Sequence, residues 1–139
     1  MNYLLDTNTV SYLLEDRAAI IGRVRDAGGL ALVAISTITL AELRYGLRIM
    51  PESRKKTRSL ASLERILDSS VDMRPFTRAA AEVYSGAGAM LKEAGIAFSF
   101  EDLAIASIVM AENKTLASND GFFGHARNLC GLRFERWEP

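Results

Sequence analysis

Hydrophobic residues along the chain form two kinds of pattern, and the first kind predicts strands. Short apolar runs with little polar alternation occur at Tyr3–Leu5 and Leu30–Ile35. Such runs are typical of strands that are covered on both faces of a sheet. Similar short stretches at Val71–Arg74, Thr115–Ala117 and Leu132–Phe134 bring the prediction to about four to five strands.

The second pattern predicts helices between these runs. Apolar residues recur every three or four positions, as they do in a helix with one buried face. The stretches with this spacing are 10–14, 20–24, 37–47, 53–69 and 77–94, followed by 101–112, which is apolar nearly all round. In the clearest of these helices, residues 77–94, the predicted buried face consists of Ala80, Val83, Tyr84, Ala87, Met90, Leu91 and Ala94.

The alternation of strands and helices predicts the fold class. Strands that alternate with helices indicate an α/β domain with a mainly parallel central sheet, flanked by helices. No repeat or linker interrupts the chain, so residues 1–139 are expected to form a single domain. In parallel sheets, ligands bind beyond the carboxyl ends of the strands, where the strand order switches. Functional residues are therefore expected at that edge.

Composition narrows the class of protein further. Apolar residues make up 49% of the 139 residues, which excludes a disordered chain. The formal net charge is zero, so a nucleic-acid partner would have to bind a local basic patch. No apolar run is long enough to span a bilayer, and no basic segment precedes the first apolar residues. We therefore expect a cytoplasmic protein with no membrane partner.

Four acidic residues stand where the predicted sheet edge lies. Asp6 comes directly after the first strand, and Asp120 follows the strand that begins at Thr115. Glu42 and Asp102 lie in the first turns of two predicted helices, among apolar residues. Each acid also has a purely structural interpretation. Asp6 is a good helix N-cap, Glu42 and Asp102 fit a capping box, and Asp120 fits a turn.

Taken together, the four acids favour a cation site. Two like charges about 4 Å apart repel by roughly 4 kcal/mol at an effective dielectric of about 20. A cluster of carboxylates must therefore share protons or bind a cation. The chain has one histidine and one cysteine, which makes a zinc site improbable, whereas an all-oxygen site suits Mg²⁺ or Mn²⁺. Divalent ions held by carboxylates are suited to phosphodiester hydrolysis.

Five segments give the chain a resemblance to a known family. They are "LLDTN" at 4–8, "ISTITLAELRYG" at 35–46, "FEDLAIAS" at 100–107, "TLASND" at 115–120 and "GLRFERW" at 131–137. Their order and content resemble the PIN-domain ribonucleases, specifically the VapC toxins of bacterial toxin–antitoxin pairs. The resemblance covers essentially the whole chain. It implies a PIN-like fold and a Mg²⁺- or Mn²⁺-dependent endoribonuclease, with RNA as substrate, a cognate VapB-type antitoxin as partner and a homodimeric assembly.

The resemblance also assigns site residues. The family's acids fall on Asp6, Glu42 and Asp102, and Asp120 takes the place of the fourth. The family often has a further acid after this position, where the present chain has "GFFG". The hydroxyls that orient the family's acids, or water at the metal, match Thr7 and Ser118. Asp120 must therefore serve alone as the fourth ligand.

Basic residues supply candidates for RNA contact. Arg54, Lys55 and Lys56 belong to the only dense basic run. Arg44 and Arg48 lie four positions apart on the helix that carries Glu42, so they share a face. These side chains either contact RNA phosphates, or form a solvated helix face and pair with nearby acids.

Two other functions compete with the ribonuclease interpretation. A phosphatase that forms an aspartyl phosphate also has an Asp after its first strand, but it usually needs a second Asp two positions later. Position 8 is Asn8 in this chain. A degenerate, non-catalytic PIN-like binding module is the more serious alternative, because no acid accompanies Phe122 and Phe123.

Overall fold

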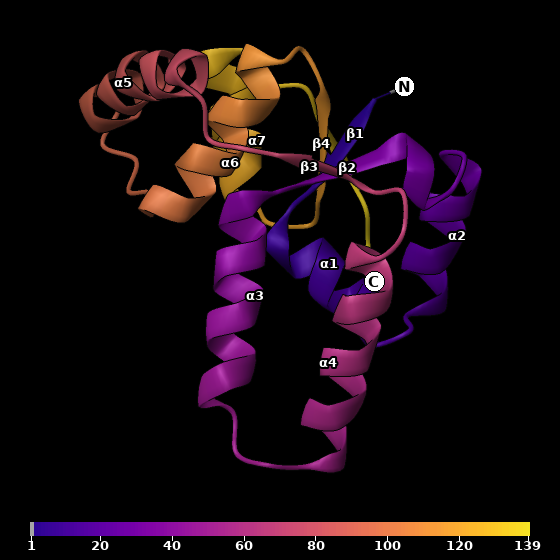
Figure 1. Ribbon diagram of the computed structural model, residues 1–139. Coiled ribbons are helices and arrows are strands. Elements are labelled where there is room, and N and C mark those ends of the chain that lie inside the picture. Colours follow the sequence, from indigo (N-terminus) through magenta and orange to yellow (C-terminus); the bar gives the residue numbers. More distant parts are fainter. Residues whose placement is uncertain (1) are drawn as a thin grey trace.

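A five-stranded parallel sheet forms the centre of the protein. The structure is a computed structural model that describes residues 2–139 (Figure 1). The strand order is β3-β2-β1-β4-β5, and every neighbouring pair is parallel. The strands are β1 (Tyr3–Leu5), β2 (Val33–Ser36), β3 (Asp72–Arg74), β4 (Thr115–Ser118) and β5 (Phe134–Arg136). The predicted α/β class with a parallel sheet is therefore confirmed.

Seven helices cover the two faces of this sheet. Helices α1 to α4 lie on one side and α5 to α7 on the other (Figure 1). Their bounds are α1 (Thr7–Leu14), α2 (Ala18–Asp26), α3 (Thr37–Ile49), α4 (Arg54–Leu67), α5 (Arg78–Glu93), α6 (Phe100–Ala111) and α7 (Phe122–Cys130). Among residues 2–139, none of these helices is both long and apolar enough to cross a membrane.

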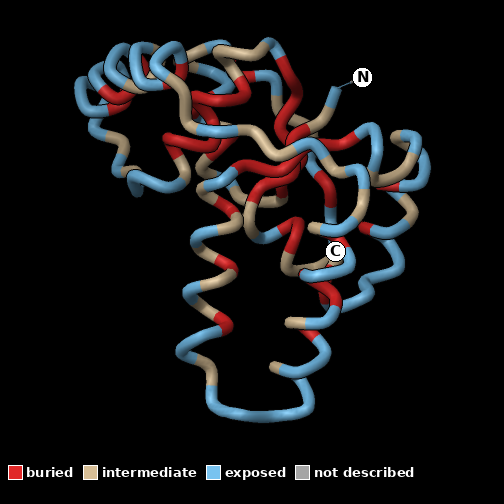
Figure 2. Tube along the Cα trace, in the orientation of Figure 1, coloured by how far each residue is buried: buried red, intermediate tan, exposed pale blue. Residues whose placement is uncertain are grey.

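Alternating side chains of the central strands divide the core in two. Leu5, Ile35 and their neighbours pack against α1 to α4, whereas Leu4 and Leu116 pack against α5 to α7. Successive residues of a strand point to opposite faces, and both faces of this sheet are covered. That arrangement explains why the strands appear in the sequence as continuous apolar runs. Figure 2 shows buried residues concentrated along the sheet and on the inner sides of the helices.

The strand order places a switch point between β1 and β4. The chain builds the sheet outward from β1 to β2 and β3, and then returns to the other side of β1 to add β4 and β5. The crossover connections on the two sides of β1 diverge at the carboxyl ends of β1 and β4. The backbone amide of Asp6 donates a hydrogen bond to the carbonyl oxygen of Ala117 at 3.2 Å, which joins these two ends.

The carboxylate of Glu135 connects the last strand, β5, to the first strand, β1, through a hydrogen bond. Glu135 accepts hydrogen bonds from the Tyr3 hydroxyl at 2.6 Å, from the Trp137 indole at 3.1 Å and from Arg23 at 3.2 Å. The Trp137 amide donates to the carbonyl oxygen of Ser118 at 2.9 Å. The C-terminal strand therefore supports the end of β4, where the candidate site lies.

Three details of the sequence prediction are wrong. Leu30–Ile35 is not one strand, because Leu30–Leu32 forms a 3₁₀ turn and β2 begins at Val33. Gly28 and Gly29 have positive φ angles and turn the chain just before this 3₁₀ turn. The Leu32 side chain is exposed as a result. An apolar run alone does not reveal such a turn.

The other two differences concern β5 and α5. The last strand is Phe134–Arg136 rather than Leu132–Phe134, because α7 continues to Cys130 and ends on the left-handed Gly131. Leu132 is buried in the connection instead. Met90 of α5 and its C-cap residue Ala94 are exposed, so the buried face of this helix is narrower than predicted.

Candidate functional site

Asp6 is both a helix cap and a buried carboxylate at the sheet edge. It follows β1 and is the N-cap of α1, where its Oδ1 accepts a hydrogen bond from the Thr9 amide at 2.8 Å. Its Oδ2 accepts a hydrogen bond from the Ser118 hydroxyl at 2.5 Å. Only 3% of the residue is exposed. The capping interpretation and the site interpretation therefore both apply to this side chain.

Burial raises the pKa of the Asp6 carboxyl above its usual range. The negative charge of Asp120 raises this pKa further, whereas the hydrogen bonds from Ser118 and Thr9 oppose the shift. Burial outweighs these hydrogen bonds because it removes the carboxylate from water. The charged form of Asp6 is therefore destabilised in the absence of a cation.

Glu42 lies in the second turn of α3 and does not cap it. The N-cap of this helix is Ser36, whose Oγ accepts a hydrogen bond from the Thr39 amide at 3.0 Å. The predicted capping box with Thr39 as the cap is therefore wrong. Instead, the Thr7 hydroxyl donates to Glu42 Oε1 at 2.6 Å. This bond connects the start of α1 to α3 and orients the carboxylate of Glu42.

Thr39 is a supporting residue that sequence reasoning missed as such. Its hydroxyl lies 3.0 Å from the Thr7 hydroxyl and 3.4 Å from the Ser36 hydroxyl. Thr39 is fully buried, so these contacts satisfy its polar group and hold Thr7 beside Glu42. The spacing of three residues between Ser36 and Thr39 is the only signal in the sequence that would have indicated the first of these contacts.

Asp102 lies in the first turn of α6, where its amide donates to the hydroxyl of the N-cap residue Ser99 at 3.1 Å. Partial burial raises the pKa of the Asp102 carboxyl. The negative charges of Asp120, Glu42 and Asp6 raise it further. All four acids therefore interact electrostatically at one place.

Asp120 follows β4 and takes part in a turn. Its amide donates to the Ser118 hydroxyl at 3.0 Å, and its Oδ1 accepts from the Phe122 amide at 2.9 Å. The predicted role of Asp120 in a turn is therefore confirmed for one of its two carboxylate oxygens, Oδ1. The residue is half-buried, and its charge acts on both Asp6 and Asp102.

The topology explains why these acids meet. The carboxyl ends of β1 and β4 adjoin at the switch point, and helices that follow or precede parallel strands have their N-termini at the same edge. Among residues 2–139, none of the four acids takes part in a salt bridge. The cluster therefore has hydroxyl and amide donors around it but no fixed cation within the chain. Its chemical role stays a prediction.

The donor set fits a hard divalent cation in kind. All its ligand atoms are oxygens, and the mutual repulsion of the carboxylates favours binding of positive charge. Among residues 2–139, no three acidic, histidine or cysteine side chains are close enough together to ligate one ion directly. Mg²⁺ usually binds one or two carboxylates directly and keeps several of its water molecules. The arrangement therefore suits an ion that keeps part of its hydration shell.

The candidate RNA-binding side chains differ in their surroundings. Arg44 forms a salt bridge to Glu64 at 2.5 Å, and Lys56 Nζ lies 2.9 Å from both Glu52 and the carbonyl oxygen of Met50. These two cations are engaged within the chain. The remaining three candidates, Arg48, Arg54 and Lys55, are exposed.

Lys55 lines a cleft that is also lined by Glu42 of the acidic cluster and by Thr7, which donates a hydrogen bond to Glu42. This cleft of about 380 Å³ lies between α1, α3 and α4 and is lined by Thr7 and Glu42 as well as by Lys55. We call it the α1–α3–α4 cleft. Arg54 lines a different hollow, on the side of Thr57 and Glu52. The structure therefore distinguishes two neighbouring residues that the sequence pattern treated alike.

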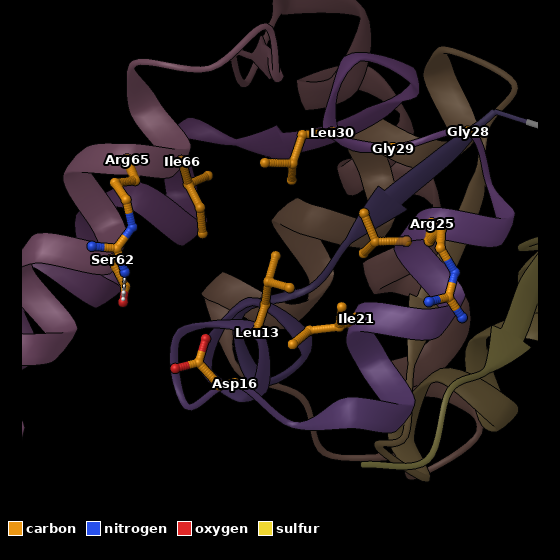
Figure 3. A pocket seen from close by; sticks show the side chains of 11 residues that line it. Leu13, Asp16, Ile21, Arg25, Gly28, Gly29, Leu30, Ser62, Arg65 and Ile66 are labelled. Atoms are coloured by element: carbon orange, nitrogen blue, oxygen red, sulfur yellow. Dashed lines mark hydrogen bonds between the residues drawn. The ribbon is translucent and has the colours of Figure 1, made fainter.

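A separate groove of about 620 Å³ lies between α1, α2 and α4. Figure 3 shows Leu13, Ile21, Leu30 and Ile66 around this α1–α2–α4 groove, which is mainly apolar. Polar side chains stand at its margin, where Arg65 donates to Ser62 at 2.8 Å. None of the four clustered acids lines this groove, so it is a second surface rather than part of the acidic site.

Comparison with known proteins places these features in a family. The PIN domain model matches residues 3–129. The chain is 30% identical to "Ribonuclease VapC2" of Rickettsia felis over 139 residues, which cover 99% of each chain. It is 33% identical to "Plasmid stability protein StbB" of Pseudomonas syringae over 121 residues, 84% of this chain and 86% of that protein.

Two solved structures have the same fold. The crystal structure of VapBC2 from Rickettsia felis bound to a DNA fragment from its promoter aligns with a TM-score of 0.83 and 29% identity, over 99% of this chain and 100% of that one. DNA-bound VapBC from Salmonella typhimurium aligns with a TM-score of 0.82 and 26% identity, over 99% of both chains.

The raised pKa of Asp6 gives a test of the cluster in the absence of metal. A folded state with a raised carboxyl pKa binds more protons than the unfolded state, so the free energy of unfolding falls as pH rises from the usual aspartate range through the raised pKa. Asp6→Asn removes this charge and keeps a good N-cap. We expect its melting temperature at pH 7 to equal or exceed that of the wild type.

Asp6→Ala is the matched control, because it removes the charge and the cap together. Loss of an N-cap costs about 1 kcal/mol, so this variant should be less stable than Asp6→Asn. Thermal unfolding in a chelator, followed by circular dichroism between pH 4 and pH 8, measures both. Equal destabilisation by Asn and Ala would mean that the charged carboxylate stabilises the fold, contrary to this account.

Proposed function

Because the chain belongs to the PIN-domain family, we propose that it is a ribonuclease toxin of the VapC type that cleaves RNA internally with the help of Mg²⁺ or Mn²⁺. One observation carries the proposal. Four carboxylates without an intramolecular cation lie at the carboxyl-end switch point of a parallel sheet, where burial and the charges of neighbouring acids raise the pKa of Asp6 and of Asp102. Such a site is prepared for a divalent ion and an anionic substrate.

The side chains of the cluster have separable roles in this proposal. Asp6, Glu42 and Asp102 hold the ion, directly or through its water shell. The hydroxyls of Ser118 and Thr7 orient two of these carboxylates, since they donate to Asp6 Oδ2 and Glu42 Oε1. The chemistry that the ion supplies when bound is activation of water and neutralisation of charge on the phosphoryl group.

Asp120 is the fourth acid of the proposed site. Its Oδ1 accepts the hydrogen bond from Phe122, so its other oxygen is the one available for a cation or for water bound to it. Because one end of this carboxylate is already fixed by a turn, we assign it to the edge of the site. Its negative charge still favours the ion through its effect on Asp6 and Asp102.

Two alternatives make different predictions. A degenerate PIN-like binding module would bind RNA or protein without metal-dependent cleavage. An aspartyl-phosphate phosphatase would need a general acid two positions after Asp6, and Asn8 does not provide one. Cleavage that depends on both the metal and the acids separates the ribonuclease from both alternatives.

The proposed partner is an antitoxin of the VapB type. The similar solved structures include DNA-bound VapBC from two bacteria and VapBC-5 of Mycobacterium tuberculosis, a member of the VapBC family of toxin–antitoxin systems. We place an apolar segment of the antitoxin in the α1–α2–α4 groove, because the groove is mainly apolar and partly exposed, with Ile21 39% accessible. Arg25 and Arg65 also line the groove and would favour acidic residues beside that segment. The homodimer and the cytoplasmic location stay predictions.

Metal binding should stabilise the folded protein through linkage, since the ion binds the assembled site and not the unfolded chain. We expect the melting temperature of the wild type to rise with the logarithm of Mg²⁺ or Mn²⁺ concentration. The Glu42→Gln, Asp102→Asn double variant should lose both this rise and the cleavage of RNA. An equal rise in both proteins would show that the metal binds elsewhere, and cleavage by the double variant would refute the proposed site.

Lys55 is expected to contact an RNA phosphate, because it lines the cleft shared with Glu42. Lys55→Ala should weaken RNA binding at low salt and flatten the slope of log affinity against log salt by about 0.7, the value for one phosphate of a single strand. Arg54→Ala is the matched control, since Arg54 is exposed but lines another hollow. Fluorescence anisotropy across a salt series measures both slopes. If the slope of log affinity against log salt is the same for both variants, Lys55 belongs to a solvated face of α4 and does not contact RNA.

Ile21 tests the proposed antitoxin groove. Ile21→Asp places a charge on an apolar surface that is already partly exposed, so we expect the variant to fold. Binding of the antitoxin to this surface should be lost. Met90→Asp, on the exposed side of α5, is the control. Each variant is co-expressed with the product of the adjacent reading frame and then purified by affinity. The amount of antitoxin that remains bound to it is the measurement. Retention by Ile21→Asp equal to that of the control would exclude this groove as the docking surface.

A further inference from the structure

The α1–α3–α4 cleft continues away from the acidic cluster, and apart from Glu42, Thr7 and Lys55 the residues that line it have no role in the function proposed above. Glu42 and Thr7 line one end, and Met50 and Lys55 line the other. Eight residues of helix separate Glu42 from Met50, which corresponds to about 12 Å along the axis of α3. The cleft is therefore an elongated extension of the acidic site with a cation at its far end.

The walls of the cleft are chemically mixed. Leu43 and Leu47 of α3 supply apolar surface, and Ser11 and Ser59 supply hydroxyls from α1 and α4. Glu15 also lines the cleft, and its charge is paired with Arg17 at 3.2 Å. An apolar surface with a few polar groups at its margin is typical of sites that bind a small organic group. The volume of about 380 Å³ suits a single nucleoside rather than a folded element of a partner protein.

Gly46 widens the cleft in the middle of α3. A Cβ atom at this position would meet no atom of the protein within 4 Å, so no close packing within the chain requires a glycine there. Glycine inside a helix is less favourable than alanine or leucine. The missing side chain leaves space in the cleft between its acidic and basic ends.

We propose that this cleft binds the nucleoside that lies between the scissile phosphate and the next phosphate of the RNA strand. The scissile phosphate lies at the acidic cluster, and the next phosphate lies at Lys55. The base between them rests on Leu43 and Leu47, over Gly46. This assignment rests on the proposed ribonuclease function and adds the position at which the enzyme contacts a base.

The geometry favours RNA over a peptide as the occupant. The cleft opens directly beside Glu42 and Thr7, which belong to the proposed catalytic site, and its far end carries a cation suited to a phosphate. Bases that leave a stack are held in protein pockets between aromatic or apolar side chains. A base in the cleft would therefore determine which unpaired nucleotide is placed next to the cleaved bond.

Gly46→Leu places a side chain in the cleft at a position where a Cβ atom meets nothing within 4 Å, and Gly86→Leu is the matched control. Gly86 lies inside α5, and a Cβ atom there also meets nothing within 4 Å. Both substitutions should leave the melting temperature unchanged or raised, because leucine is the better helix former. We expect Gly46→Leu alone to slow the cleavage of RNA, by about tenfold or more.

The decisive substrates are oligoribonucleotides that differ only by one abasic residue near the cleavage position. For the wild type and Gly86→Leu, one abasic position should lower binding and cleavage by about tenfold. Gly46→Leu should show no further loss at that position, since its cleft is already filled. Gly46→Ala is a smaller change and should give an intermediate loss of RNA cleavage. This variant replaces Gly46→Leu in the experiment if the leucine variant does not fold.

Three results would overturn the proposal. Wild-type rates and an unchanged abasic profile for Gly46→Leu would mean that no base enters the cleft. Loss of antitoxin retention by Gly46→Leu with unchanged RNA cleavage would assign the cleft to the protein partner. If the wild type cleaves none of the RNAs in Mg²⁺ or Mn²⁺, the ribonuclease function itself fails, and the base site fails with it. The first two results leave the ribonuclease function standing.

Discussion

Repulsion between carboxylates at one edge of the sheet is the constraint on which the rest of the structure depends. Burial and the charges of neighbouring acids raise the pKa of Asp6 and of Asp102, and no lysine or arginine of the described chain pairs with any of the four acids. Charge left uncompensated in a partly buried place destabilises the folded state unless a proton or a cation is bound. The surrounding structure therefore has to hold the acids together against a force that separates them. Arg44, two positions after Glu42 on α3, pairs with Glu64 rather than with Glu42.

The fold resists this force with short hydrogen bonds between elements that are far apart in the sequence. Ser118 and Thr7 each donate to a carboxylate of the cluster, and the amide of Asp6 is bonded to β4. The Thr7 hydroxyl is in turn hydrogen-bonded to the Thr39 hydroxyl, and the amide of Trp137 donates to the carbonyl oxygen of Ser118. A hydroxyl donor orients a carboxylate without cancelling its charge. The site thus keeps its affinity for a cation while its geometry is held by neutral groups.

Sequence patterns predicted the sheet and the positions of the acids because both follow from local rules. Strands covered on both faces are continuously apolar, and an acid after such a strand lies at its carboxyl end. What the patterns missed depends on partners distant in the sequence. The cap of α3 is Ser36 rather than Thr39, and the start of β5 depends on where α7 ends. The α1–α3–α4 cleft has three helices as walls, so no single stretch of sequence describes it. The difference between Lys55 and Arg54 is likewise invisible until α4 is placed beside α3.

The hydrogen bond between Ser118 and Asp6 joins residues that are 112 positions apart. Contacts of such long sequence separation form late, because the intervening chain must first be ordered. Because synthesis runs from the N-terminus, a nascent chain on the ribosome contains Asp6 well before it contains Ser118 and Asp120. Until β4 pairs with β1, Asp6 has no hydroxyl to orient it, and the last carboxylate of the cluster is absent. The acidic site is therefore assembled only after β4 has been translated and has paired with β1.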